Sequence, residues 1–356
     1  MSVARNSISA LMQPILGSIL LLRAMFYMGP EFNGEDPLFA SNETLEVTLE
    51  APLVELMRER DEEKELPGTL QYTDAAGATV QLDVQVRTRG KFRAQKDICD
   101  FAPLRLNFRK SQAKGTLFEK QDKLKLVTHC DTRSERYEQA IITEYLTYRI
   151  LNIFTDYSYR ARLLRISYLP TDGKRKLDSY AFLIEKDERL AKRIEQKLVA
   201  TDKLKISDLD SKYTNLVSLF QYLVGNTDFS PIAAASGLEC CHNHTPFSAD
   251  DKVFYSIPYD FDQCGIVDSP HASPNRRFKL RSVRQRLYRG RCVNNELLPA
   301  TLDLFREKRP DIEALIANQA ELSKKTRGRT ESFLRSFYKT IDNPKLVNRY
   351  LVRKCN

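Results

Sequence analysis

Several motifs that identify large protein classes are missing from the chain. Its seven cysteines include no CxxC pair, so zinc sites of the treble-clef or ribbon type are not expected. There is no G-x-x-x-x-G-K-[S/T] P-loop and no G-x-G-x-x-G loop, which argues against a P-loop NTPase and against the phosphate loop of a standard kinase. Tryptophan is absent and the basic residues are dispersed along the chain, so a nucleic-acid-binding protein is not indicated.

Long apolar runs are scarce as well. The best candidate, residues 10–22, is too short to cross a bilayer but has the length of a signal-peptide core, and Arg23 closes it. We therefore expect residues 1–42 to be a signal- or anchor-like segment with a linker. This predicts a periplasmic or secreted protein, or one tethered to a membrane at its N-terminus. The alternative is an amphipathic helix docked on the domain of a cytoplasmic protein.

Size and charge set broad limits. With 356 residues, of which 42% are hydrophobic, the chain can form one large domain or two with a proper core. The net charge of +9 favours acidic partners such as phosphates or nucleotides, but a solvated basic surface would give the same count.

Hydrophobic periodicity changes along the chain from that of strands to that of helices. A helical pattern runs over 132–154, where Thr132 and Glu135 form a capping-box sequence, and it dominates after residue 190. Apolar and polar residues alternate, as in strands, near 44–52, 78–88, 102–110, 122–130, 160–170 and 179–187. This order predicts an α+β protein of two lobes, a β-rich N-lobe over 43–190 and a mainly helical C-lobe over 191–356.

Acids and an amide are concentrated between residues 226 and 262. Asp228 follows a helix that ends at Gly225, Asn243 lies in a loop, and Asp260 and Asp262 end a short strand. Phosphoryl transfer needs a carboxylate that orients the attacking hydroxyl, and a carboxylate and an amide that hold Mg²⁺. The order acid, amide, strand, metal-binding acid is that of kinases, although the gap between Asp228 and Asn243 is longer than in the kinase loop.

At these residues the chain resembles the CotH-type atypical secretory kinases and exported bacterial proteins related to them. The resemblance rests on the stretches "RTRGKFR", "PLRLNF", "EYLTYRILN", "FLIEKDERLAKR", "FQYLVGNTDFS", "CHNH", "YDFDQCG" and "VRQRLYRGRC". It implies a two-lobed, protein-kinase-like fold, ATP with Mg²⁺ or Mn²⁺, and phosphorylation of Ser or Thr of exported proteins. By position, Asp228 would be the catalytic acid and Asp260 the metal ligand, supported or replaced by Asp262. Asn243 would be a second metal ligand.

To bind the nucleotide, a kinase needs a cation on a strand of the small lobe, and a glutamate on the following helix holds that cation in place. Lys125 and Glu144 occupy such positions, with Arg105 as a competing cation and Glu138 as a competing acid. Each also has a plain interpretation, since strand cations can simply face solvent and Glu144 can pair along its own helix.

Two further features fit a nucleotide. Arg89 and Lys91 lie in a glycine-containing turn that could grip phosphate, or could be only a basic turn. Glu185 follows a strand at the place of an inter-lobe hinge.

The cysteines admit two interpretations, disulfides in an oxidising compartment or reduced cytosolic thiols. For the first we expect the bridges Cys99–Cys130 and Cys264–Cys292. A zinc cluster of Cys240, Cys241, His242 and His244 competes with a disulfide or a structural loop there, and adjacent ligands fit one tetrahedral ion poorly.

The sequence is therefore compatible with three functions. The first is an ATP- and Mg²⁺-dependent kinase that acts on exported or envelope proteins. The second is a kinase-like module that binds a nucleotide or another anion without turnover. The third is an envelope structural protein whose acids bind Ca²⁺.

Overall fold

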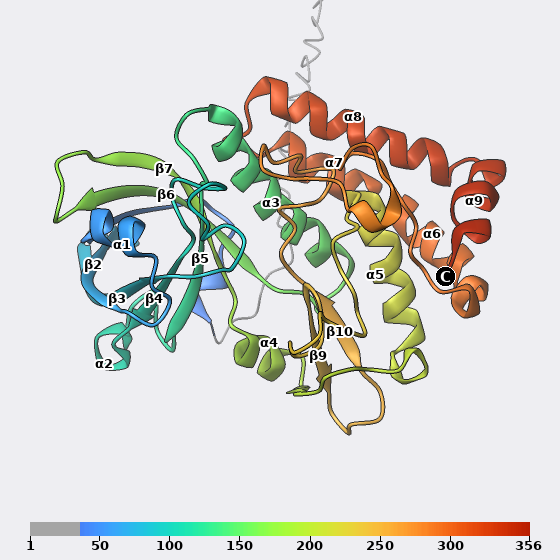
Figure 1. Cartoon of the computed structure of the whole chain (residues 1–356), viewed down its shortest axis with the longest axis horizontal. Coiled ribbons are helices and arrows are strands. Elements are labelled where there is room, and N and C mark those ends of the chain that lie inside the picture. Colours follow the sequence, from blue (N-terminus) through green and yellow to red (C-terminus); the bar gives the residue numbers. More distant parts are fainter. Residues whose placement is uncertain (1–35) are drawn as a thin grey trace, which may run out of the picture.

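The structure is a computed structural model and describes residues 36–356 (Figure 1). The greater part of the expected signal- or anchor-like segment, residues 1–35, lies outside the described residues. Among residues 36–356, no helix combines the length and the apolar character needed to cross a membrane.

Seven strands close into a barrel, on the left of Figure 1, in the order β1-β2-β3-β4-β5-β7-β6. The ring closes because β1 pairs in parallel with β6, so that Val47 lies opposite Ile166, whereas the other neighbours are antiparallel. The strands are β1 (Leu45–Ala51), β2 (Leu66–Thr73), β3 (Thr79–Thr88), β4 (Leu104–Phe108), β5 (Lys123–Thr128), β6 (Ala161–Pro170) and β7 (Leu177–Ile184).

The predicted two-lobed, protein-kinase-like fold is wrong, because this closed mixed barrel stands where a separate N-lobe sheet was expected. Closure pairs the strand edges that an open sheet would leave free. Period-2 alternation identifies a strand but not its partner, so the pairing of β1 with β6 was not visible in the sequence. The domain boundary expected near residue 190 falls inside α4 (Asp187–Arg193).

Helices and a short second sheet, of order β10-β9-β8, lie beside the barrel (Figure 1). The long helix α3 packs on β6 and β7, and α5 to α8 lie on its other side. Ser134, rather than the predicted Thr132, caps α3 by accepting the N–H of Arg136. The remaining elements are α1 (Leu53–Glu59), α2 (Lys110–Ala113), α3 (Glu135–Phe154), β8 (Lys197–Leu198), α5 (Ser211–Val224), β9 (His244–Ser248), β10 (Tyr255–Pro258), α6 (Leu298–Glu307), α7 (Arg309–Ala317), α8 (Lys324–Ile341) and α9 (Pro344–Tyr350).

Strand β7 belongs to two hydrophobic cores at once. Ala181 and Leu183 point into the barrel, whereas Phe182 and Ile184 point into the core formed with the helices. Because successive side chains of a strand face opposite ways, the apolar run of β7 fills both cores. The barrel wall and the helices are thereby held together, and the site described next lies where they meet.

Candidate functional site

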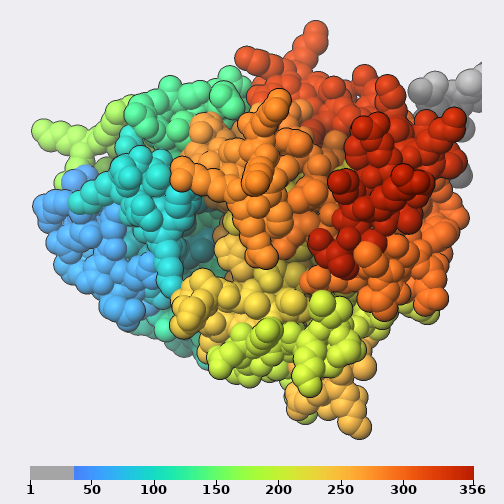
Figure 2. All heavy atoms as spheres, turned by 45° about the vertical axis from the view of Figure 1, so that its right-hand side comes forward, coloured from blue at the N-terminus to red at the C-terminus, as the bar shows by residue number. Residues whose placement is uncertain are grey.

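A cavity of about 850 Å³ lies between the barrel and the helical part of the chain. The loop after β3, strand β5, helix α3, the loop before β9 and the segment after β10 all contribute to its lining. Figure 2 shows it as a recess between the cyan loop that follows β3 and the yellow and orange segments. Eight of the ten predicted site residues line it: Arg89, Lys91, Lys125, Glu144, Asp228, Asn243, Asp260 and Asp262.

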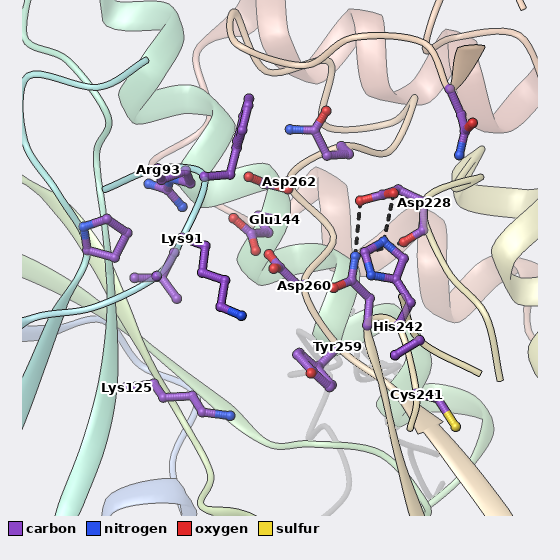
Figure 3. Close-up of a pocket in the computed structure, with 18 of the residues that line it drawn as sticks. Lys91, Arg93, Lys125, Glu144, Asp228, Cys241, His242, Tyr259, Asp260 and Asp262 are labelled. Atoms are coloured by element: carbon purple, nitrogen blue, oxygen red, sulfur yellow. Dashed lines mark hydrogen bonds and ion pairs between the residues drawn. The ribbon is translucent and has the colours of Figure 1, made fainter. Parts of the chain in front are cut away.

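Three carboxylates form what we call the acidic group, Glu144, Asp260 and Asp262, whose side chains point into the same space in Figure 3. Helix α3 supplies Glu144, and Asp260 lies two residues after the end of β10. The backbone of Asp260 is left-handed, with φ of 61°, and its N–H donates to the hydroxyl of Tyr148 at 2.9 Å. Strained backbone of this kind is concentrated at functional sites.

The acidic group is electrostatically strained. Burial raises the pKa of Glu144 well above its usual range, and the carboxylates of Asp262 and Asp260 raise it further. Burial and the charge of Asp262 raise the pKa of Asp260 to about 7. Solvent in the cavity also reaches this side chain, and water moderates the effect of its ionisation on stability.

Asp262 behaves differently because it has a dedicated partner. Burial would raise its pKa, but a hydrogen bond from His271 Nε2 at 3.0 Å and the charge of Arg93 outweigh burial, and the pKa is lowered. The carboxylate of Asp262 is thus kept ionised, and its negative charge raises the pKa of Glu144 and of Asp260.

Asp228 forms a separate cluster across the cavity from the acidic group (Figure 3). Asn243 donates from Nδ2 to the backbone oxygen of Asp228 at 2.7 Å and to its Oδ2 at 3.1 Å. His242 Nε2 lies 2.9 Å from Oδ1. The long gap between Asp228 and Asn243 in the sequence is therefore closed in space, and both carboxylate oxygens of Asp228 have a fixed partner.

Cations line the barrel side of the cavity, and we call them the basic wall: Arg89, Lys91, Arg93 and Lys125. Burial lowers the pKa of Lys125, and its ammonium lies 3.7 Å from the carboxylate of Asp187 and 5.1 Å from the ring centre of Tyr259. The expected ion pair of Lys125 with Glu144, both described residues, is not present. Burial also lowers the pKa of Arg89, against the opposing charge of Asp260.

Two predicted nucleotide-binding residues do not line the cavity. Arg105 neighbours Lys125 in the register of β4 and β5. Glu185 accepts the N–H of Arg160 at 3.0 Å and pairs with Arg193 at 2.7 Å, beside a smaller hollow. The competing acid Glu138 lies in the first turn of α3.

The cysteines form three bridges in the described residues. The predicted Cys99–Cys130 bridge is confirmed. The predicted Cys264–Cys292 bridge is wrong, because Cys292 bonds to Cys355 and Cys264 is a buried free thiol.

Of the alternatives at Cys240, Cys241, His242 and His244, the structure shows the disulfide and not the zinc cluster. Cys240 and Cys241 bond to each other, and His244 is buried against Ser256 and Gln221. Within residues 36–356, the sole trio of His, Cys or carboxylate ligand atoms that all lie within 4.8 Å is Cys99, Cys130 and His271, of which two form a disulfide.

Sequence reasoning missed His271, the contact of His242 with Asp228, and the role of Tyr148 in holding Asp260. Tyr148 lies four positions after Glu144 on α3, so the two share a helix face, and this spacing was a usable signal. His271 lies in a loop, where no periodic pattern marks it.

Comparisons with known proteins add no family assignment. No protein-family model matches the chain, and no curated protein matches it significantly.

Proposed function

We propose that the chain is a phosphotransferase that uses ATP with Mg²⁺ or Mn²⁺ and phosphorylates Ser or Thr of exported or envelope proteins. The supporting observation is that one cavity contains the acidic group, the basic wall and Asp228 with its two fixed partners. The resemblance to CotH-type kinases is used here for the site residues only, and not for the fold. The disulfides favour an oxidising compartment such as the periplasm or the exterior of the cell.

Two carboxylates of the acidic group suit a hard divalent cation, although the three do not all bring an oxygen within 4.8 Å of one another. Carboxylate oxygens are the ligands Mg²⁺ prefers. Burial first, and then repulsion among the carboxylates, raises the pKa of Glu144 and Asp260, and a cation would relieve that repulsion. Mg²⁺ usually keeps waters and phosphate oxygens among its ligands, so two carboxylates suffice. When bound, the cation would neutralise charge on the β- and γ-phosphates.

The chain's own residues would act as follows. Arg89, Lys91 and Lys125 would contact the phosphates from the basic wall. Asp228, held by Asn243 and His242, would orient the acceptor hydroxyl and accept its proton. The hydroxyl oxygen would bond to the γ-phosphorus while the bond from that phosphorus to the β–γ bridging oxygen breaks, and ADP would leave.

Radiolabelled ATP tests this proposal with the full chain and a dephosphorylated envelope extract as acceptor. Asp228→Asn and Asp260→Asn should each reduce label transfer by a factor of at least about 100. Asp202→Asn, an exposed acid in the loop after β8, is the matched control and should transfer as the wild type does. Equal transfer by the wild type and both site variants would exclude the proposal.

A nucleotide-binding module without turnover is the second candidate. It is favoured by two contacts: Lys125 pairs with Asp187 rather than with Glu144, and the Asn243 amide is engaged with Asp228. Calorimetry with Mg·ATP beside the transfer assay separates the two functions, since binding without transfer supports the module. Stabilisation by Ca²⁺ but not by Mg·ATP would instead support the calcium-binding structural protein.

A further inference from the structure

A strongly basic segment borders the cavity on the side of Asp228. Between Ser269 and Asn295 the chain has no acidic residue and eight basic ones: Arg276, Arg277, Lys279, Arg281, Arg284, Arg286, Arg289 and Arg291. The expectation that basic residues are dispersed therefore fails here. Among the described residues, only Arg284 of the eight has a carboxylate partner within 4.0 Å, Asp268 at 3.7 Å.

Arg289 connects this segment by hydrogen bonds to the loop that contains Asp228. Its guanidinium donates to the backbone oxygens of Thr227, at 3.1 Å, and Phe229, at 2.6 Å, the two neighbours of Asp228. It also lies 4.3 Å from the ring centre of Phe229 and 4.8 Å from that of Phe278. The basic segment is thus held against the residue that would receive the acceptor hydroxyl.

Around Arg289 the like charges of Arg291 and Arg277 are opposed by the carboxylate of Asp228 alone among the described residues that act on its pKa. Burial lowers the pKa of Arg289 to about 10, and the nearby charges of Arg291 and Arg277 lower it further. Arg277 is exposed, Arg291 is half-buried, and neither has a carboxylate partner in residues 36–356. Arg276 lines the cavity itself. Guanidinium groups gathered in this way match carboxylates and phosphates, which they bind through paired N–H donors.

We propose that the segment from Arg276 to Arg291 binds an acidic stretch of the acceptor polypeptide and so places its Ser or Thr at Asp228. The acidic stretch consists of Asp, Glu or phosphorylated residues next to the acceptor. This inference rests on the proposed function and adds the substrate class. A polypeptide fits better than a nucleic acid, because Arg289 already lies over the rings of Phe229 and Phe278, where a base would otherwise stack.

Peptide binding tests this without any transfer reaction. A fluorescent peptide of Asp and Glu around one Ser is titrated against the full chain in the absence of nucleotide, and anisotropy is read. The same peptide with Asn and Gln is the neutral comparison. Arg277→Gln combined with Arg291→Gln should weaken binding of the acidic peptide by about tenfold or more.

The matched control also loses two arginines, through Arg109→Gln combined with Arg175→Gln. Both control positions are exposed on the barrel, at the start of α2 and in the turn between β6 and β7. The control should bind as the wild type does. Circular dichroism establishes that both double variants fold. If the site variant does not fold, Lys279→Gln combined with Arg281→Gln, both exposed, replaces it with the same expected loss.

Three results would overturn the inference: equal affinity for the acidic and neutral peptides, equal losses in the site and control variants, or tighter binding of a single-stranded oligonucleotide of the same charge. Because no nucleotide is used, these results leave the proposed transfer reaction untouched. Transfer to a neutral acceptor without acidic-peptide binding would refute only the substrate class.

Discussion

His271 donates a hydrogen bond from Nε2 to Oδ2 of Asp262 at 3.0 Å, and the two side chains are only 6% and 8% exposed. The centre of its ring lies 6.4 Å from that of Phe92, which is tilted to it, and 6.5 Å from that of Tyr137, which is stacked, and the ring lies beside the Cys99–Cys130 bridge. His271 therefore positions the Asp262 carboxylate of the acidic group, and His271 itself lies beside the Cys99–Cys130 disulfide.

Replacing the histidine should disorient Asp262. We expect His271→Ala to weaken Mg²⁺ binding by about tenfold, as is usual when the partner of a metal ligand is lost. His271→Gln, which keeps an N–H donor, should retain part of the affinity. Calorimetric titration with MgCl₂ in the absence of nucleotide measures both. Wild-type affinity in His271→Ala would show that this hydrogen bond does not position the ligand.

The two long-range disulfides should differ in their effect on the site. They close loops of 31 and 63 residues, so in the chain-entropy model each stabilises the fold by about 3–4 kcal/mol. Double Cys→Ser variants of either pair should lower the melting temperature. Only the Cys99/Cys130 variant should also weaken Mg²⁺ binding, because that bridge contacts His271. The Cys292/Cys355 variant is the control, and equal Mg²⁺ affinities in both would contradict the link.

Removing the Asp260 carboxylate should stabilise the protein above pH 7. Its pKa is raised from about 3.8 to about 7, so ionisation costs stability as the pH rises through that interval. We expect Asp260→Asn to gain about 1 kcal/mol at pH 8, a value reduced because solvent reaches the side chain, and little at pH 4. Thermal unfolding in EDTA at both pH values measures this. Added Mg²⁺ should stabilise the wild type and not the variant; a variant less stable at pH 8 would refute the assignment.

The contact between His242 and Asp228 should be visible by titration. The hydrogen bond to Asp228 raises the pKa of His242 above 6.5, so the contact stabilises the fold below that pH and is lost as the pH rises through the raised pKa. In proton NMR the His242 ring should titrate above 6.5, and Asp228→Asn should lower its midpoint. Burial lowers the pKa of His129 to about 4 and of His244 to about 3, so these rings are internal controls that stay neutral from pH 5 to 8. An unchanged midpoint in the variant would contradict the contact.

Local patterns predicted most of the barrel strands but not how they are joined. Alternation in "ATVQLDVQV" and "KLKLV" placed β3 and β5 correctly, because one face of each strand is buried in the barrel. Strand β2 was missed, since Pro67 and Gly68 near its start are read as turn residues. The parallel contact of β1 with β6 depends on tertiary packing, and no local pattern carries it.

The candidate site was foreseen where residues lie at the ends of elements. Asp228 follows the left-handed C-cap Gly225 of α5, and Asp260 follows β10, so both could be expected to leave the core and face a common space. The partner of Lys125 could not be foreseen, because Asp187 reaches it from the start of α4, three residues after Ile184, and the pairing of Ile184 with Lys125 in β7 and β5 depends on tertiary packing. Glu144 was predicted to serve that lysine and instead lies with Asp260 and Asp262.

Closure of the barrel through β1 and β6 also limits how early in synthesis the barrel can fold. Leu45 pairs with Leu164, so the first strand must wait until more than a hundred further residues have been made or translocated. Contacts this distant in sequence slow folding, because the loop entropy is lost before the contact is gained. Until then β1 exposes an unpaired edge to other chains. Aggregation should therefore be most acute before β6 has been made, and a holdase that covers strand edges would protect this chain during that interval.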